Sequence, residues 1–278
     1  MNRPEVTPLL AGLCSVTLRH LSADDVARVV ERAGLAALEW GGDVHVPPGD
    51  RTAADRARAA AAAAGVELVT YGSYLVTAPG LDPAETARVF DTAAALGAAG
   101  VRVWCPSGTP PRDVGSVEPG VREALGLVAE EAAARGMIAA MEYHGGTLTA
   151  TAVGTRALLD AVDHPALTAY WQPPYWQPER VARPDAAADL ADLERLASAL
   201  AHLHVYEWGP GLERRALSAG ASRWRPILEQ AGRWAVPGGG PRAALLEFVA
   251  GDDPERVVTD ATTLRGWLAD ATGTGAGR

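Results

Sequence analysis

Two glutamates stand at the ends of segments that are otherwise apolar. Glu142 follows Ile-Ala-Ala-Met, and Glu247 follows Ala-Ala-Leu-Leu. Burying a carboxylate there costs free energy unless a cation or hydrogen bonds compensate its charge. His204 lies in a third apolar segment, Gln172 ends a fourth, and this donor set suits one Mn²⁺, Mg²⁺, Zn²⁺, Co²⁺ or Fe²⁺ ion. The residues predict a divalent-metal site, and the competing interpretation is a buried ion-pair network with arginines.

Seven further residues, at or just beyond the ends of apolar segments, are predicted to contact substrate. They are Trp40, His45, Ser73, His144, Trp176, Trp208 and Arg214. The tryptophans could grip the apolar faces of a sugar ring, with core packing as the alternative. The histidines could contact hydroxyls or cap loops. Arg214 could meet a phosphate or carboxylate or stay solvated, whereas we expect only a solvated or pairing role for Arg102.

The elements that must position these residues alternate along the whole chain. Short apolar segments predict buried strands at residues 9–15, 36–41, 66–74, 101–106, 138–144, 167–173, 200–208 and 243–249. Amphipathic stretches between them predict helices, including residues 24–33, 52–64, 83–96, 119–135 and 185–199. Ser22, Asp82 and Asp253 are expected helix caps, the last two standing before prolines.

Near-continuous apolar strands joined by helices indicate a parallel sheet covered on its faces, and eight repeats match a closed barrel. We therefore expect an α/β fold, a single (β/α)8 TIM barrel over residues 1–271, with a flexible tail at 272–278. A doubly wound open sheet is less consistent, because no GxGxxG follows the first strand. In such a barrel, the C-terminal ends of the strands form the active-site face.

Composition excludes several classes of protein. The net charge of −9 opposes general nucleic-acid binding. The chain has no lysine, which removes Schiff-base aldolases, pyridoxal-phosphate enzymes and Walker-type phosphate loops. Cys14 and Cys105 lack CxxC spacing and are expected to be buried and unpaired. No signal peptide or membrane-spanning segment is apparent, so we expect a cytoplasmic protein with no membrane partner, whose oligomeric state, a homo-oligomer included, stays open.

The sequence resembles the xylose-isomerase-like barrels, which include sugar isomerases, ketose 3-epimerases, inosose dehydratases and endonuclease IV. The resemblance covers nearly the whole chain. It is carried by four segments, namely Leu-Glu-Trp at 38–40, Met-Glu-Tyr-His-Gly-Gly-Thr at 141–147, His-Leu-His-Val at 202–205 and Leu-Leu-Glu at 245–247. It implies one divalent ion, Mn²⁺ above the other candidates, held by Glu142, His204 and Glu247.

One position departs from the family pattern. The family usually has Asp on strand six followed by His, whereas this chain has Gln172 and then Tyr175. The amide oxygen of Gln172 can still coordinate, but the site loses one negative charge and should hold its metal less tightly. The missing His commonly touches sugar hydroxyls, so the substitution leaves the substrate and reaction open.

The resemblance implies that Glu142 and Glu247 also serve as general base and acid. A metal that holds a carbonyl and an adjacent hydroxyl acidifies the intervening C–H and stabilises an enediolate-type intermediate. The leading hypothesis is a metal-dependent isomerase or epimerase of a sugar, keto-sugar or cyclitol. The alternatives are a metal-dependent lyase, by dehydration or 3-keto-glycoside cleavage, and a non-catalytic sugar-binding protein. Endonuclease activity is disfavoured by the acidic net charge.

Overall fold

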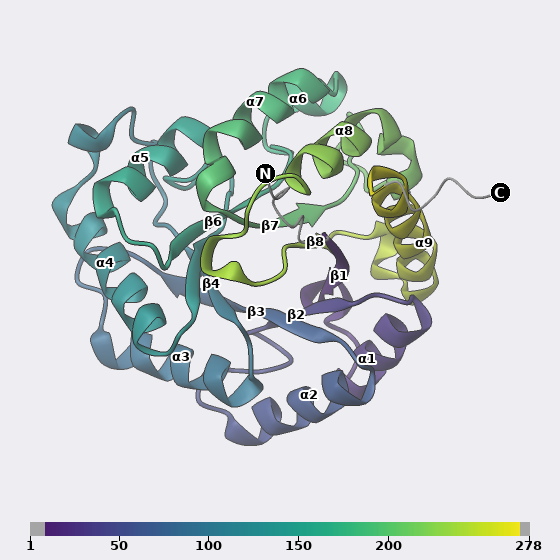
Figure 1. Cartoon of the computed structure of the whole chain (residues 1–278), viewed down its shortest axis with the longest axis horizontal. Helices are drawn as coiled ribbons and strands as arrows, with labels where there is room; N and C mark the ends of the chain where they lie inside the picture. The colour runs from purple at the N-terminus through teal and green to yellow at the C-terminus, as the bar shows by residue number, and fades with distance from the viewer. Residues whose placement is uncertain (1–8, 273–278) are drawn as a thin grey trace, which may run out of the picture.

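The computed structural model describes residues 9–272, in which eight parallel strands pair in chain order and close into a barrel (Figure 1). The strands are β1 Leu10–Cys14, β2 Ala37–Gly41, β3 Glu67–Val76, β4 Gly100–Trp104, β5 Ile138–Met141, β6 Leu167–Trp171, β7 Leu200–Val205 and β8 Ala243–Leu246. Pairing of β1 with β8 completes the ring. The sequence prediction of a single (β/α)8 barrel is confirmed; the predicted tail at 272–278 lies, beyond Thr272, outside the described residues.

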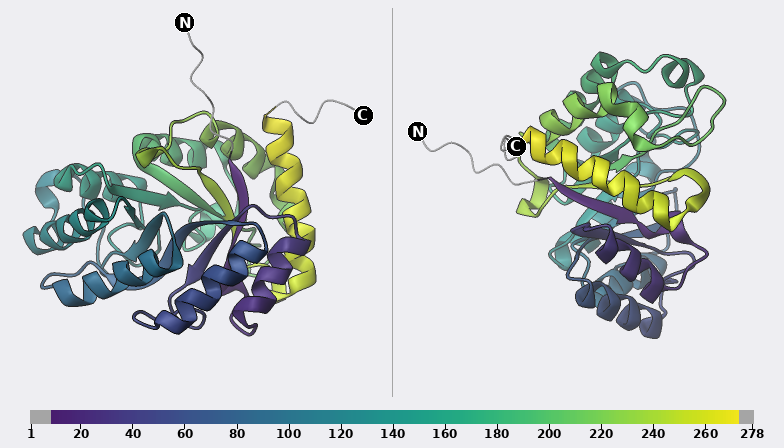
Figure 2. Two further views of the ribbon diagram at one scale, coloured as in Figure 1. Left: turned by 60° about the horizontal axis from the view of Figure 1, so that its bottom comes forward. Right: turned by 90° about the vertical axis from the view of Figure 1, so that its right-hand side faces the viewer.

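The helices form a ring around the barrel (Figure 1). They are α1 Ala23–Arg32, α2 Arg51–Ala63, α3 Pro83–Leu96, α4 Pro119–Ala134, α5 Ala152–Val162, α6 Pro178–Ala182, α7 Ala186–Leu196, α8 Ala221–Ala231 and α9 Pro254–Ala271. Figure 2 shows α9, the last helix, lying alongside β1, and its contacts with α1 and α8 close the outer ring of helices. Within residues 9–272, no helix has the length and apolar character needed to cross a membrane.

The helix boundaries follow the predicted capping residues. The Ser22 hydroxyl accepts a hydrogen bond from the Asp25 amide at the start of α1. Asp82 and Asp253 likewise cap α3 and α9, each followed by proline in the first turn. Gly97 ends α3 in the left-handed region, with φ +78°, which a side chain would strain.

Two apolar layers hold the molecule together. Outward-facing strand residues pack with the helices in the larger cluster, and the smaller cluster, which includes Cys14, Ala37, Ala140 and Tyr170, fills the barrel interior. Gly12 is required there, because a Cβ at this position would come within 2.6 Å of the Leu245 side chain. The small residues of the interior let the strands approach closely, and the polar side chains of the site lie above them.

Candidate functional site

The four predicted ligand residues meet at the C-terminal mouth of the barrel. Glu142, Gln172 and Glu247 directly follow the last residues of β5, β6 and β8, and His204 is the penultimate residue of β7. The backbone amides of the two glutamates extend the sheet by donating to carbonyls of β4 and β7 at 2.9 and 3.0 Å. All four side chains are buried. Sheet pairing thus carries residues from distant parts of the chain to one point.

The imidazole of His204 is at the centre of this group. Its Nδ1 lies 3.2 Å from Gln172 Oε1, 3.5 Å from Glu247 Oε2 and 3.9 Å from Glu142 Oε1. Metal–ligand bonds of about 2.0–2.2 Å allow two ligand atoms on one ion to be at most ~4.4 Å apart. Each of the three separations from His204 satisfies this limit, so His204 can share an ion with any one of these neighbours. Glu142 and Glu247 do not both lie within 4.8 Å of His204 and of each other, so a single ion held by both glutamates would require their side chains to move closer.

A buried arginine that the sequence analysis set aside belongs to the site. Arg102, in the middle of β4, is 2% exposed, and its guanidinium forms ion pairs with Glu39 Oε1 at 3.1 Å and with Glu142 Oε2. Glu142 therefore directs one oxygen at Arg102 and the other at His204. The expected pairing role of Arg102 is present, but it is exercised at the site and not in solvent.

The structure makes room for this ion pair. Glu39, on β2, also accepts hydrogen bonds from the hydroxyls of Thr70 at 2.8 Å and Tyr170 at 2.7 Å. A Cβ on Gly72 would lie 2.6 Å from Glu39 Oε1 and 2.9 Å from Arg102 Nη2. Glycine at this position of β3 is therefore needed for the Glu39–Arg102 contact.

Glu247 has different surroundings from Glu142. Its Oε2 is buried and has no hydrogen-bond partner among residues 9–272. Burial raises the pKa of Glu247 to about 7, Arg102 opposes that shift and Glu39 adds to it. Burial, with a smaller contribution from Arg102, holds the pKa of His204 well below its usual value, so the imidazole is neutral at neutral pH. A neutral imidazole can act as a metal ligand.

A cavity of about 230 Å³ opens directly above these groups. Both glutamates line it together with basic, aromatic and small residues from several strand ends. The lining consists of Val16, Thr17, Arg19, Tyr74, Arg102, Trp104, Glu142, His144, Arg214, Glu247, Phe248 and Asp252. The mixture of ionic groups and rings suits a small polar molecule that also presents an apolar face.

Two of the predicted substrate-contacting residues lie in the cavity wall. The His144 ring packs against Trp104 with centroids 4.5 Å apart, and its Nε2 is 2.9 Å from the Tyr175 hydroxyl. The Arg214 guanidinium lies over the Phe248 ring at 5.2 Å and forms an ion pair with Asp252 through Nη1. Phe248 adopts φ +51°, an unusual backbone conformation for a non-glycine residue, immediately after Glu247.

The other five lie outside that wall. Trp40 is buried in the layer between barrel and helices, and Ser73 donates its hydroxyl to the Arg102 carbonyl at 2.6 Å. His45 is bound between Ser15 and the Leu21 carbonyl. Trp176 packs behind His144, with centroids 5.8 Å apart, and Trp208 packs on Phe248 with centroids 5.4 Å apart. Trp176 and Trp208 therefore support wall residues, whereas Trp40 and His45 lie away from the cavity.

The structure adds cavity residues that the sequence analysis did not select, chiefly Arg19, Arg102, Trp104 and Phe248. One signal was available for Arg102. Arg102 stands between Val101 and Val103 in an apolar strand. Glu39 stands in the same way between Leu38 and Trp40. Because side chains alternate across a strand, an ionic residue between outward apolar neighbours points into the barrel.

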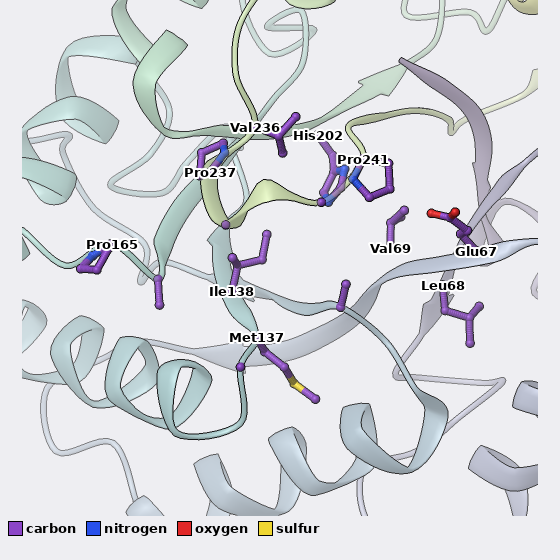
Figure 3. A pocket seen from close by; sticks show the side chains of 15 residues that line it. Glu67, Leu68, Val69, Met137, Ile138, Pro165, His202, Val236, Pro237 and Pro241 are labelled. Atoms are coloured by element: carbon purple, nitrogen blue, oxygen red, sulfur yellow. The ribbon is translucent and has the colours of Figure 1, made fainter. Parts of the chain in front are cut away.

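A second, larger cavity of about 390 Å³ lies at the opposite end of the barrel (Figure 3). It is bordered by the first residues of several strands, including Glu67 and Ile138, and by the Pro237–Gly239 turn before β8. His202 is its buried polar residue, and its Nδ1 accepts from the Ala243 amide at 3.1 Å. The lining is mostly apolar, and the cavity lies at the N-terminal ends of the strands, whereas the two glutamates follow the C-terminal ends. This cavity is therefore separate from the glutamate site.

Comparison with known protein families gives one match over most of the chain. The sequence model of the xylose isomerase-like TIM barrel family matches residues 27–244. No curated protein shows significant sequence similarity to the chain.

Solved structures with the same fold cover almost the full length. The probable 3-DHS dehydratase AsbF from Bacillus anthracis aligns with TM-score 0.70 and 16% identity, covering 92% of this chain and 99% of that one. A xylose isomerase-like TIM barrel protein from Mycobacterium smegmatis, solved in complex with magnesium, gives 0.68 and 16%, with coverages of 98% and 99%. D-allulose 3-epimerase from Methylomonas gives 0.66 and 14%, with coverages of 96% and 100%. At these identities the likeness concerns the fold.

Proposed function

Because the chain belongs to the xylose isomerase-like TIM barrel family, we propose that it is a divalent-metal-dependent isomerase or epimerase of a sugar, keto-sugar or cyclitol. The observation that carries the proposal is the placement of Glu142 and Glu247. They come from strands three apart around the barrel, line one cavity, and lie 3.9 and 3.5 Å from the same His204 nitrogen.

His204, Glu247, the free oxygen of Glu142 and the amide oxygen of Gln172 would hold the ion. When bound, a divalent ion polarises a substrate carbonyl and makes the neighbouring C–H more acidic. Magnesium in the Mycobacterium smegmatis protein, which has the same fold, supports this cofactor class without selecting the ion.

The protein's own groups then divide the work. One of the two carboxylates removes the carbon-bound proton, which is general base catalysis. If the other carboxylate returns a proton to the opposite face of the same carbon, the product is the epimer, and if the proton returns to the adjacent carbon of the enediolate, the product is the isomer. Arg102 fixes the orientation of Glu142 through its ion pair. The rings of Trp104, His144 and Phe248 can cover the apolar face of the substrate and restrict water.

The reaction leaves a direct isotopic signature. Purified protein incubated with sugars, keto-sugars and cyclitols in deuterated water should introduce deuterium at carbon, detected by mass spectrometry and NMR, and elemental analysis should find one divalent ion per chain. Glu207→Gln is a matched control, because Glu207 is also a buried glutamate after β7 but lies outside the cavity lining. Full exchange activity and metal content in both Glu142→Gln and Glu247→Gln would exclude the proposal.

The same residues could serve a metal-dependent lyase, because removal of a proton next to a carbonyl can also expel a leaving group. The same fold occurs in the probable 3-DHS dehydratase, which supports the lyase as a second candidate. Product mass separates the two reactions: isomerisation conserves it, and elimination loses water or an aglycone. Ligand binding without exchange or turnover would instead indicate a sugar-binding protein.

A further inference from the structure

A cysteine thiol lies beside the proposed ligands. Cys14 is the last residue of β1, is fully buried and belongs to the interior cluster of the barrel. One ligand atom each from Cys14, His204 and Glu247 all lie within 4.8 Å of one another. Glu142 is not a member of this group. Among the His, Cys, Asp and Glu side chains of residues 9–272, the group that meets this distance limit therefore includes a residue that neither the sequence analysis nor the family resemblance selected.

A second observation, two buried polar atoms without hydrogen-bond partners, supports cation binding by this set. Glu247 Oε2 and His204 Nε2 are both buried and have no hydrogen-bond partner within the described part of the chain. An unsatisfied buried carboxylate oxygen costs substantial free energy, and cation binding is one way to recover it. The orphaned oxygen of Glu247 is also the one that lies 3.5 Å from His204 Nδ1.

The ligand positions on strands five and six are weakened by other contacts. Arg102 already pairs with Glu142 Oε2, and so compensates the charge that this carboxylate would contribute. Gln172 is neutral, and its Nε2 donates to the Tyr143 carbonyl at 2.5 Å. A thiolate from β1 would restore the negative charge missing at Gln172.

We propose that Cys14, His204 and Glu247 form a Cys/His/Glu site for a thiophilic divalent cation of the zinc class, with the cavity side left open for substrate. One thiolate, one neutral imidazole and one carboxylate together carry two negative charges, which balance a divalent ion. Three protein ligands and an open position are typical of catalytic zinc sites. Thiolate ligation favours Zn²⁺, and Co²⁺ or Cd²⁺ as probes, over Mg²⁺ and Mn²⁺. The inference rests on the proposed function for His204 and Glu247, and replaces the expectation of Mn²⁺.

Cobalt is the probe that reports this site directly. Metal-freed wild-type protein titrated with Co²⁺ should develop an intense thiolate-to-cobalt charge-transfer band in the near ultraviolet. Cys14→Ser should lose the band and bind Zn²⁺ at least ~10-fold more weakly, in the range seen when a site's supporting groups are removed. Cys105→Ser is the matched control, because Cys105 is also buried but outside the ligand group; it should keep the band and the affinity.

Wild-type protein also gives a test that needs no variant. X-ray absorption of the Zn²⁺-loaded protein should show one sulfur scatterer at ~2.3 Å. Metal binding without a sulfur ligand, unchanged in Cys14→Ser and lost in Glu142→Gln, would overturn the inference and leave the proposed function standing. A sulfur-ligated ion in a protein that gives no carbon–deuterium exchange would support the cysteine site and overturn the proposed function. Failure of wild-type protein to bind any divalent ion would overturn the cysteine site.

Discussion

Glu142 and Glu247 occupy matching places in the barrel but have opposite surroundings. Each follows the last residue of a strand, each is buried, and each lines the same cavity. Glu142 forms an ion pair with Arg102, whereas Glu247 Oε2 has no hydrogen-bond partner among the described residues. The neighbours, and not the residue type or its position, thus decide which carboxylate is held in place by the protein and which is left for an ion or a proton.

The largest expected effect is the loss of proton transfer. Glu142→Gln and Glu247→Gln should each lower kcat/KM by ~10²–10⁴-fold, the usual contribution of a general acid or base. Metal content should distinguish the two variants. It should fall further in Glu247→Gln than in Glu142→Gln, because the carboxylate that has no hydrogen-bond partner for Oε2 loses its charge. Steady-state kinetics on a substrate found by deuterium exchange, with elemental analysis, measures both. Equal metal loss in the two variants would count against the contrast.

Removing Arg102 should act mainly through the two carboxylates with which it forms ion pairs. Arg102→Met leaves Glu39 and Glu142 buried without their cation, so the free energy of unfolding should fall by ~3–5 kcal/mol, as for other broken buried pairs. Arg19→Met is the control: Arg19 pairs with Asp43 at 2.5 Å but is 48% exposed at its side chain, and its loss should cost ~1 kcal/mol or less. Denaturant unfolding of the metal-free variants measures the two losses of unfolding free energy. Similar losses in both variants would contradict the role given to Arg102.

Glu247 should show its isolation as a pH dependence of stability. Burial raises its folded pKa from 4.5 to about 7, so the folded protein favours the protonated form and loses stability as pH rises through this interval. Metal-free Glu247→Gln should match wild type near pH 4.5 and exceed its stability by ~2–3 kcal/mol at pH 8. Denaturant unfolding at the two pH values, with chelator present, is the measurement. If the difference in unfolding free energy between Glu247→Gln and wild type did not grow with pH, Glu247 would not have a raised pKa, which would weaken its contrast with Glu142.

A smaller effect is expected at the cavity wall beside Glu247. Arg214 forms its ion pair with Asp252 through one nitrogen and rests on Phe248, which leaves its guanidinium edge at the cavity. Arg214→Met should raise KM about 10-fold for substrates bearing a phosphate or carboxylate, which corresponds to ~1.4 kcal/mol. Neutral sugars should be little affected. Comparing KM for a neutral and an anionic substrate of the same skeleton tests this, and equal changes for the two would refute it.

The fold could be predicted because its signal is repeated eight times, but details of single elements could not. The sequence predicts one strand over residues 200–208, yet β7 ends at Val205. Tyr206 and Trp208 beyond it pack with Tyr175 and Phe248 in an aromatic group. Hydrophobicity alone does not distinguish a strand from a loop that buries aromatic rings.

At the site, the sequence predicted which residues would meet but not how they would pair. Glu142, Gln172, His204 and Glu247 come together as expected from their strand ends. The pairing of Arg102 with Glu142 could not be predicted, because the alternation along β4 places the arginine inside the barrel but does not say which of the carboxylates there it meets. Trp40 was expected at the rim, although the alternation along β2 turns it outward when Glu39 points inward.

The central claim is that His204 and Glu247 capture one divalent cation at the barrel mouth, and anomalous diffraction tests it most directly. Crystals of the full chain grown with Zn²⁺, and separately with Mn²⁺, should show an anomalous peak at each metal's absorption edge within ~2.0–2.3 Å of a His204 nitrogen and a Glu247 oxygen. A metal-replete crystal with no peak there, and with Arg102 still the cation nearest the glutamates, would contradict the account.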